Sequence, residues 1–254
     1  MKAKQIASVI ESFAPLDTQE SWDNAGFCIG SPEQEVHGVL VGFDCTPDLV
    51  DEAVSLGADM IVTHHPLIFN GLKRIDPDDF VGSAVIKAIR GGIAVYAAHT
   101  NADKAEGGVT ALMAARLDLR NVQPLVPSNL AQIGDLPQPM APADFLAMAK
   151  DAFGLKVLRY SGEGRPQIRR VALCGGSGSE FVGDARSVGA DAFLTGDISY
   201  HRYLVDKSML ILDVGHYESE VAIVDKFLSL LKDNFPTFAI HTSKKNNNNP
   251  IHYL

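Results

Sequence analysis

Short apolar runs alternate with amphipathic stretches along the first half of the chain. Apolar, mostly β-branched residues at 39–41, 60–62 and 93–95 predict buried strands. Residues 49–55 and 81–90, which lie between these runs, repeat their apolar positions at helical spacing. Strands that alternate with helices are typical of βαβ units and of a mainly parallel sheet covered by helices. The pattern therefore predicts an α/β fold.

The second half of the chain repeats this pattern. Residues 39–65 align without a gap with residues 171–197, and the shared tripeptide Gly-Ala-Asp occurs at 57–59 and at 189–191. Thr63 corresponds to Thr195, whereas His64 and His65 correspond to Gly196 and Asp197. An internal duplication is the simplest explanation, and chance similarity between two generic βαβ units is the alternative. Only the first copy can carry a double-histidine site.

A proline-bearing stretch, residues 124–142, breaks the periodicity and suggests a linker between two modules. We accordingly predict two related, duplicated α/β modules with mixed, mainly parallel sheets covered by helices. The first comprises residues 1–124 and 216–254, and the second comprises residues 125–215. The polar stretch 243–249 is predicted to be a solvated loop.

Composition and charge narrow the function classes. The chain has 254 residues, of which 46% are hydrophobic and 21% charged, and a net charge of -9, which disfavours a broad surface for nucleic-acid phosphates. The three cysteines are scattered and outside CxxC spacing, so a disulfide framework or a thiolate zinc site is not indicated and a reducing cytoplasm fits best. No stretch approaches the ~18 continuous apolar residues of a membrane span. We therefore expect a cytoplasmic protein without a membrane or nucleic-acid partner.

Histidines and carboxylates follow three of the predicted strands. His64 and His65 end one strand, and the following Pro66 favours an extended or turn conformation that would let both rings reach the same crevice. His99 with Asp103, and His216 with Glu220, are each four residues apart, so on a helix each pair would share one face. Side chains at the carboxyl ends of parallel strands point into the crevice where open α/β sheets bind ligands.

This set of donors indicates a metal site. Imidazole and carboxylate donors without thiolate suit zinc, manganese, iron, cobalt or nickel. Two ions bridged by a carboxylate would favour hydrolysis or hydration, because a bound water is ionised near neutral pH. For any single histidine, the alternative is a core or capping residue whose nitrogens are satisfied locally.

Two further motifs have two interpretations each. The glycine-rich segment 174–179 follows a strand, where it could offer backbone N–H groups to a phosphate or simply form a tight turn, which we favour. The segment Trp22-Asp23-Asn24 could line the site, or it could form a turn in which Asp23 or Asn24 bonds its own backbone and Trp22 covers the core.

Five segments together resemble one known family, the NIF-three-like proteins, also called GTP cyclohydrolase 1 type 2 homologues. They are WDNAG at 22–26, THHPLIF at 63–69, HTNAD at 99–103 followed by GGV at 107–109, TGDISYH at 195–201 and DVGHYESE at 213–220. They occur in the family's order across nearly the whole chain, which resembles the short form that lacks an inserted middle domain.

The resemblance implies a site, an assembly and an activity. It implies that His64, His65, Asp103, His216 and Glu220 hold two divalent transition-metal ions (zinc, iron, manganese or nickel), with Glu220 as the bridge and the adjacent histidines on different ions. His99 would be a proton carrier or orient a ligand, and His201 has a similar or a purely structural role. The family fold consists of two related α/β modules, and its members form a toroidal homohexamer.

The leading hypothesis is thus a dinuclear metal-dependent hydrolase, of cyclohydrolase type, that acts on a small, nucleotide-like substrate. The alternative is a non-enzymatic metal-binding protein with a regulatory or interaction role. An open coordination position would favour the enzyme, and closed coordination would favour the binding role.

Overall fold

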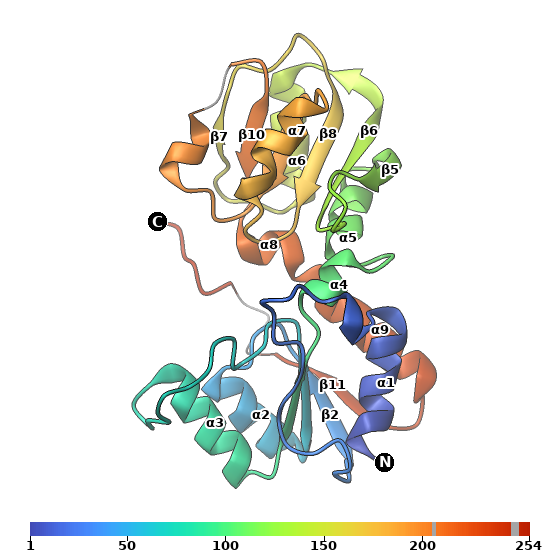
Figure 1. Cartoon of the computed structure of the whole chain (residues 1–254), viewed down its shortest axis with the longest axis vertical. Coiled ribbons are helices and arrows are strands. Elements are labelled where there is room, and N and C mark those ends of the chain that lie inside the picture. The colour runs from blue at the N-terminus through green and yellow to red at the C-terminus, as the bar shows by residue number, and fades with distance from the viewer. Residues whose placement is uncertain (205–206, 245–248) are drawn as a thin grey trace. The chain divides into compact units, whose positions relative to one another are not determined.

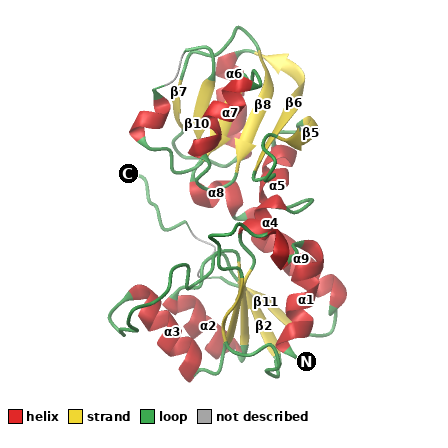
Figure 2. Cartoon of the chain, in the orientation of Figure 1, coloured by secondary structure: helices red, strands yellow, loops and turns green. Residues whose placement is uncertain are grey.

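The computed structural model describes residues 1–204, 207–244 and 249–254. It divides into two compact units, residues 1–105 with 223–250 and residues 106–222 with 251–254. Each unit is a sheet of parallel and antiparallel strands covered by helices, so the predicted α/β fold is confirmed (Figures 1 and 2). Residues 245–248 of the predicted solvated loop lie outside the described residues.

The first unit contains a five-stranded sheet in the order β1-β4-β3-β2-β11. Strands β11, β2, β3 and β4 run parallel, and β1 is antiparallel to β4. Its strands are β1 (Gly26–Ile29), β2 (Gly38–Val41), β3 (Met60–Thr63), β4 (Ala94–Ala97) and β11 (Ala239–Thr242), and its helices are α1 (Ala3–Phe13), α2 (Pro47–Leu56), α3 (Phe80–Arg90), α4 (Thr100–Lys104) and α9 (Ala222–Asn234).

The central strands of this sheet are buried on both faces, which explains their continuous apolar sequences. Leu40, Ile61 and Val95 pack with residues of α2 and α3 in one core cluster. Helices α1 and α9 lie on the opposite face of the sheet (Figure 1). The sheet therefore presents the carboxyl ends of β2, β3 and β4 side by side at one edge.

The second unit contains a six-stranded sheet in the order β5-β6-β8-β9-β10-β7. Strands β8, β9 and β10 are parallel, and the other pairings are antiparallel. Its strands are β5 (Arg120–Pro124), β6 (Ala131–Met140), β7 (Arg159–Ser161), β8 (Ile168–Cys174), β9 (Ala192–Thr195) and β10 (Leu210–Asp213), and its helices are α5 (Val109–Arg116), α6 (Pro142–Ala152), α7 (Val182–Ser187) and α8 (His216–Glu220).

The two units share a sequence of elements that agrees with an internal duplication. In the first unit three adjacent strands, β2, β3 and β4, run parallel, and helix α2 connects the first two. In the second unit β8, β9 and β10 run parallel in the same way, and helix α7 lies between the first two. Strand β3 starts at Met60 and β9 starts at Ala192, the same offset that relates Thr63 to Thr195. A short helix follows the third of these strands in both units, α4 after β4 and α8 after β10.

The proline-bearing segment 124–142 is not the predicted linker, because most of it forms strand β6 in the second sheet. Pro137 and Pro139 fall where the pairing of β6 with β8 shifts register, between Asp135 and Met140, so they interrupt a ladder that is already irregular. The observed units also begin and end elsewhere than the predicted modules 1–124 with 216–254 and 125–215. Helix α5 belongs to the second unit because it packs against β6, β8 and α8.

None of the helices in the described part of the chain combines the length and the apolar character that a membrane crossing requires.

Candidate metal centre

His64 and His65 leave strand β3 in a turn that keeps both rings together. The strand ends at Thr63, and the backbone N–H groups of both histidines donate to the carbonyl oxygen of Phe43, each at 3.2 Å. The two ring centroids are 4.8 Å apart. Buried Phe43 stacks against His64 with 5.8 Å between centroids and 24° between planes. Two neighbouring residues just beyond the end of β3 thus present their imidazoles at the same edge of the sheet.

Each of these rings is oriented by an acceptor at Nδ1. The Nδ1 of His64 lies 2.9 Å from the carbonyl oxygen of Ala98, and the Nδ1 of His65 lies 2.7 Å from Oδ1 of Asp44. Because a carbonyl oxygen or an ionised carboxylate only accepts, Nδ1 carries the hydrogen and donates it. In the neutral ring, Nε2 then presents its lone pair, the arrangement that fixes histidine as a metal ligand.

Asp103 faces His64 from helix α4. Its Oδ1 lies 3.4 Å from Nε2 of His64, and both residues are buried. A ring lone pair and a carboxylate oxygen are both acceptors, so their approach is favourable only with a proton or a cation between them. These two atoms therefore fit one side of a metal site.

His99 has another arrangement. It is the residue before α4, with φ -111° and ψ -108°, so it lies outside the helix and the predicted sharing of a helical face with Asp103 is wrong. Its Nδ1 lies 2.7 Å from Oδ1 of Asp23, whose carboxylate also accepts from the backbone N–H and the hydroxyl of Thr100. Burial alone would raise the pKa of Asp23, but the hydrogen bonds from His99 and Thr100 and the charge of His99 hold it well below its usual range.

The second unit places His216 and Glu220 on helix α8 as the four-residue spacing predicts. Nε2 of His216 lies 3.0 Å from Oε2 of Glu220, and Nδ1 of His216 lies 2.7 Å from Oδ2 of Asp197. Glu220 is 4% exposed, so its carboxylate is positioned inside the protein and not on the surface. One carboxylate thus orients the ring of His216 from Nδ1 while a second faces Nε2, whereas the corresponding partners of His64 are the carbonyl oxygen of Ala98 and the carboxylate of Asp103.

The glycine-rich segment 174–179 forms a tight turn beside this pair. Gly176 has φ +57°, and a Cβ atom there would overlap Oε1 of Glu220. Its backbone N–H donates to Oγ of Ser219, and that of Gly178 donates to Oγ1 of Thr195. These two amides are used within the fold, which favours the turn over the phosphate-binding interpretation.

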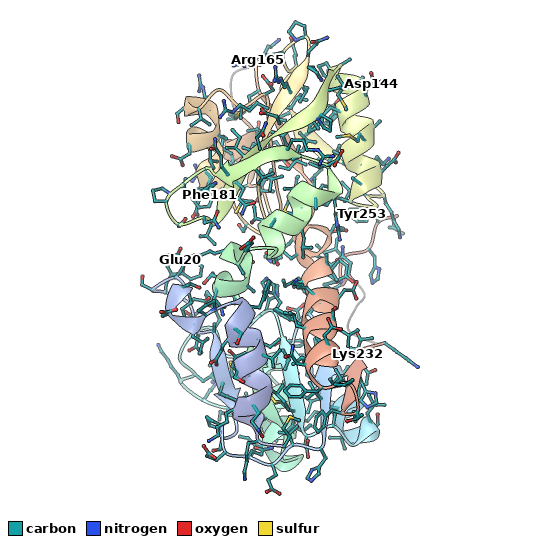
Figure 3. The ribbon with its side chains drawn as sticks, turned by 90° about the vertical axis from the view of Figure 1, so that its right-hand side faces the viewer. Glu20, Asp144, Arg165, Phe181, Lys232 and Tyr253 are labelled. Atoms are coloured by element: carbon teal, nitrogen blue, oxygen red, sulfur yellow. The ribbon has the colours of Figure 1, made fainter. Side chains whose placement is uncertain are left out.

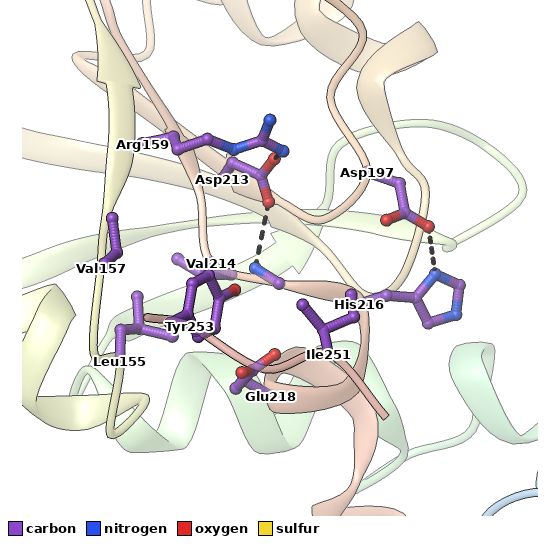
Figure 4. Close-up of a pocket in the computed structure, with 11 residues that line it drawn as sticks. Leu155, Val157, Arg159, Asp197, Asp213, Val214, His216, Glu218, Ile251 and Tyr253 are labelled. Carbon is purple, nitrogen blue, oxygen red and sulfur yellow. Dashed lines mark hydrogen bonds and ion pairs between the residues drawn. The ribbon is translucent and has the colours of Figure 1, made fainter. Parts of the chain in front are cut away.

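A pocket of about 310 Å³ adjoins His216 in the second unit (Figure 4). Buried Asp213 is one of its lining residues and accepts from Arg159 and, at 3.1 Å, from the backbone N–H of Gly215. Burial and the nearby Asp213 raise the pKa of Tyr203 to about 12, so its hydroxyl donates to this carboxylate at neutral pH. Asp213 thus fixes the turn that starts α8. The pocket is lined by Leu155, Val157, Arg159, Asp197, Asp213, Val214, Gly215, His216, Glu218, Ile251 and Tyr253.

Sequence reasoning missed the carboxylates that orient the rings. Asp44 follows β2 and Asp197 follows β9, so the strand-end rule that selected the histidines could also have found them. The segment Trp22-Asp23-Asn24 was predicted either to line the site or to form a turn under Trp22. Oδ1 of Asp23 accepts from the N–H of Asn24 and also orients His99, whereas Trp22 is exposed and does not cover the core. His201 is exposed in the 3₁₀ turn Tyr200–Tyr203 and packs against Tyr200.

Fold and donors together define a duplicated α/β protein with side chains suited to a metal ion, among them His64, His65 and Glu220. The chain belongs to the family described as Duf34/NIF3 (NGG1p interacting factor 3), whose model matches residues 1–250. This confirms the family expected from the sequence motifs.

Curated relatives match over most of their length. The chain is 32% identical over 262 residues to a GTP cyclohydrolase 1 type 2 homolog of Clostridium perfringens, with 100% of both chains covered. It is 35% identical over 232 residues to a protein of the same name from Streptomyces coelicolor, with 86% of this chain and 81% of the relative covered.

Solved structures agree with the fold. A hypothetical protein of Staphylococcus aureus aligns with a TM-score of 0.89 at 28% identity, covering 100% of this chain and 99% of the other. Reduced HcgD from Methanocaldococcus jannaschii aligns with a TM-score of 0.84 at 26% identity, covering 96% of this chain and 98% of the other.

Proposed function

We propose that this protein is a metal-dependent hydrolase that uses two divalent transition-metal ions to act on a small, nucleotide-like substrate. The relatives named GTP cyclohydrolase 1 type 2 homolog support the reaction class by their names alone. The proposal depends mainly on the chemistry of the histidines in each unit.

The observation that carries the proposal is the repeated environment of the imidazoles. In both units Nδ1 is held by an oxygen at 2.7–2.9 Å while Nε2 of His64 and of His216 faces a carboxylate oxygen at 3.4 Å and 3.0 Å. A neutral core histidine donates from one nitrogen and accepts at the other, so an acceptor opposite each of its nitrogens is not the arrangement that burial alone requires. Such a fixed pair of acceptors is the arrangement in which a metal ion replaces the proton.

The proposed ligands are His64, His65 and Asp103 in the first unit and His216 and Glu220 in the second. Family resemblance supports the proposal that these five residues would hold the two ions. Imidazole and carboxylate donors suit zinc, iron, manganese or nickel, and cellular supply would decide among them. When bound, such ions would supply Lewis acidity and lower the pKa of a water molecule at the site.

His99 would carry the proton in this reaction. Asp23 accepts the hydrogen of Nδ1, so the neutral ring offers Nε2 as a proton acceptor. A histidine whose second nitrogen is held by a buried carboxylate is the usual arrangement of a general base, because the carboxylate stabilises the imidazolium that forms. Its ring centroid lies 5.4 Å from those of both His64 and His65, so the proton acceptor would stand beside the proposed ligands.

The test combines metal analysis with a substrate screen. Purified protein would be assayed against phosphoesters, nucleotides and cyclic amides, alongside Glu220→Ala and the control Glu180→Ala, which changes an exposed carboxylate in the same unit. We expect activity in wild type and in the control and a loss of at least about a hundredfold in Glu220→Ala. Full activity in Glu220→Ala would show that the reaction does not depend on the proposed metal centre.

The same measurements separate the enzyme from a non-enzymatic metal-binding protein with a regulatory or interaction role. Stoichiometric metal without turnover of any screened substrate would favour that alternative. We further propose, from the family resemblance, that the chain acts in the cytoplasm and assembles as a toroidal homohexamer. Light scattering of the purified protein would test this assembly, and a monomer at all concentrations would contradict it.

A further inference from the structure

Two large aromatic side chains stand exposed beside His99 in the first unit. Trp22 is 57% exposed and Phe69 is 43% exposed, and their ring centroids are 6.0 Å apart with the planes at 62°. Trp22 lies 6.4 Å and Phe69 lies 5.9 Å from the centroid of His99. The three rings therefore form one contiguous aromatic surface, and Trp22 and Phe69 are called the exposed pair below.

The backbone around both rings is fixed. Asp23, next to Trp22, binds His99 and Thr100 through a buried carboxylate. The amide Nδ2 of Asn24 donates to the carbonyl oxygen of Ile68, the residue before Phe69, at 2.5 Å. The backbone N–H of Glu20, a residue labelled in Figure 3, donates to Oγ1 of Thr100 at 2.9 Å, which holds the start of the same segment. The fold thus holds two apolar rings in place without burying them.

The position of this surface gives it a chemical context. His99 is the ring between the exposed pair and the proposed ligands, because its centroid is 5.4 Å from those of His64 and His65. Exposure falls across the cluster, since the side chain of His99 is 16% exposed and that of His64 is fully buried. If the reacting atom of a substrate lies beside His99, the neighbouring part of that substrate would contact Trp22 or Phe69.

We propose that Trp22 and Phe69 bind a planar, π-rich ring of the substrate and so select compounds that carry an aromatic or heteroaromatic group. Such a ring gains an offset-stacked or edge-to-face contact with an aromatic side chain that a saturated group of the same size does not gain. Contiguous exposed apolar surface beside polar, titratable side chains is also the usual composition of a ligand site. The inference rests on the proposed function, because it assigns the ring to the substrate of that site.

The chain contains one tryptophan, so its intrinsic fluorescence reports on Trp22 directly. Metal-loaded protein would be titrated with adenosine monophosphate, which carries a planar ring, and with ribose phosphate, which has the same phosphate and sugar without it. We expect saturable quenching by the first compound and none by the second. Phe69→Leu should weaken the affinity about two- to tenfold, whereas Phe69→Tyr should retain it.

The control variant is Phe80→Leu, which changes another exposed phenylalanine of the same unit and should leave the affinity unchanged. Equal responses to both ligands, or equal effects of Phe69→Leu and Phe80→Leu, would overturn the inference. The inference would also be overturned if the fluorescence of Trp22 responded to neither ligand but changed on dilution of the protein, because the exposed pair would then be covered by a second copy of the chain. Metal content is measured on the same samples, so a protein that binds metal but shows no ring-dependent quenching contradicts this inference alone.

Discussion

Asp44 and His65 are joined by a 2.7 Å contact between Oδ1 and Nδ1, which links the end of one parallel strand to the end of its neighbour. The contact fixes which nitrogen of His65 carries the hydrogen. It therefore determines that Nε2 is the atom available to a metal ion. Asp44 is not a proposed ligand, but it orients the ring of one.

Asp44→Ala should lower metal affinity about 10- to 100-fold without removing a proposed ligand. The physical reason is that the ring of His65 would lose both its orientation and its defined tautomer. Competition with a chromophoric chelator would measure the affinity. Asp59→Ala is the matched control, because Asp59 holds Nδ1 of His37 at 2.8 Å in the same way but away from the site. Equal affinity losses in the two variants would mean that general destabilisation, not ring orientation, is responsible.

Asp197→Ala should have the same effect on the second unit, where Asp197 holds Nδ1 of His216. Asp197 has φ +51°, a left-handed conformation that asparagine also adopts readily, so Asp197→Asn keeps the backbone and retains an oxygen acceptor. We expect a smaller loss of metal affinity in the asparagine variant than in the alanine variant. Calorimetric titration with zinc would measure both, and the reverse order would contradict this role of Asp197.

Gly176→Ala should disturb Glu220 specifically. The new Cβ atom would overlap Oε1 of Glu220, and the positive φ would cost ~1–2 kcal/mol of stability. Gly189→Ala is the control because Gly189 has φ +75° but no heavy atom of the described chain within 4 Å of the added Cβ. Both variants should lose similar stability in urea unfolding, and only Gly176→Ala should lose metal. Unchanged metal content in Gly176→Ala would contradict this expectation, because the protein would then hold the metal although the new Cβ atom displaces the Glu220 carboxylate.

Asp23 should make stability depend on pH. Its pKa is held below the ordinary value of 3.8, so its contribution is fully present above that pH and is lost as the pH falls through the folded-state pKa. Asp23→Asn should reduce the unfolding free energy of metal-free protein by about 1–3 kcal/mol at neutral pH. The difference from wild type should shrink at acidic pH.

Urea unfolding at a series of pH values would test this dependence. Asp118→Asn is the control, because its ion pair with Arg120 is exposed on both sides and should contribute little. A difference between Asp23→Asn and wild type that stays constant into the acid range would contradict the assigned cause.

Much of the fold follows from the sequence because strands β2, β3 and β4 are buried on both faces and read as continuous apolar runs. Strand β6 was missed because Pro137 and Pro139 look like breaks, and only its pairing with β8 reveals that they occupy an irregular stretch of the ladder. Local periodicity carries no information about such pairing between distant segments.

The candidate site was predictable to a similar extent. The pairing of His216 with Glu220 is local to one helical turn, so spacing alone predicted it. The partners of His65 and His99 are 21 and 76 residues away in the chain, and only the fold brings them together. His99 also shows the limit of spacing, since its backbone leaves helical geometry at the residue before α4.

Metal stoichiometry is the most direct test of the central claim. Elemental analysis of purified, reconstituted protein should find two transition-metal ions per chain in wild type, and lower values in His65→Ala and in His216→Ala. The control His37→Ala, which removes an exposed histidine in contact with Asp59, should retain the wild-type value. A wild-type protein that holds less than about one ion per chain after reconstitution would contradict the account.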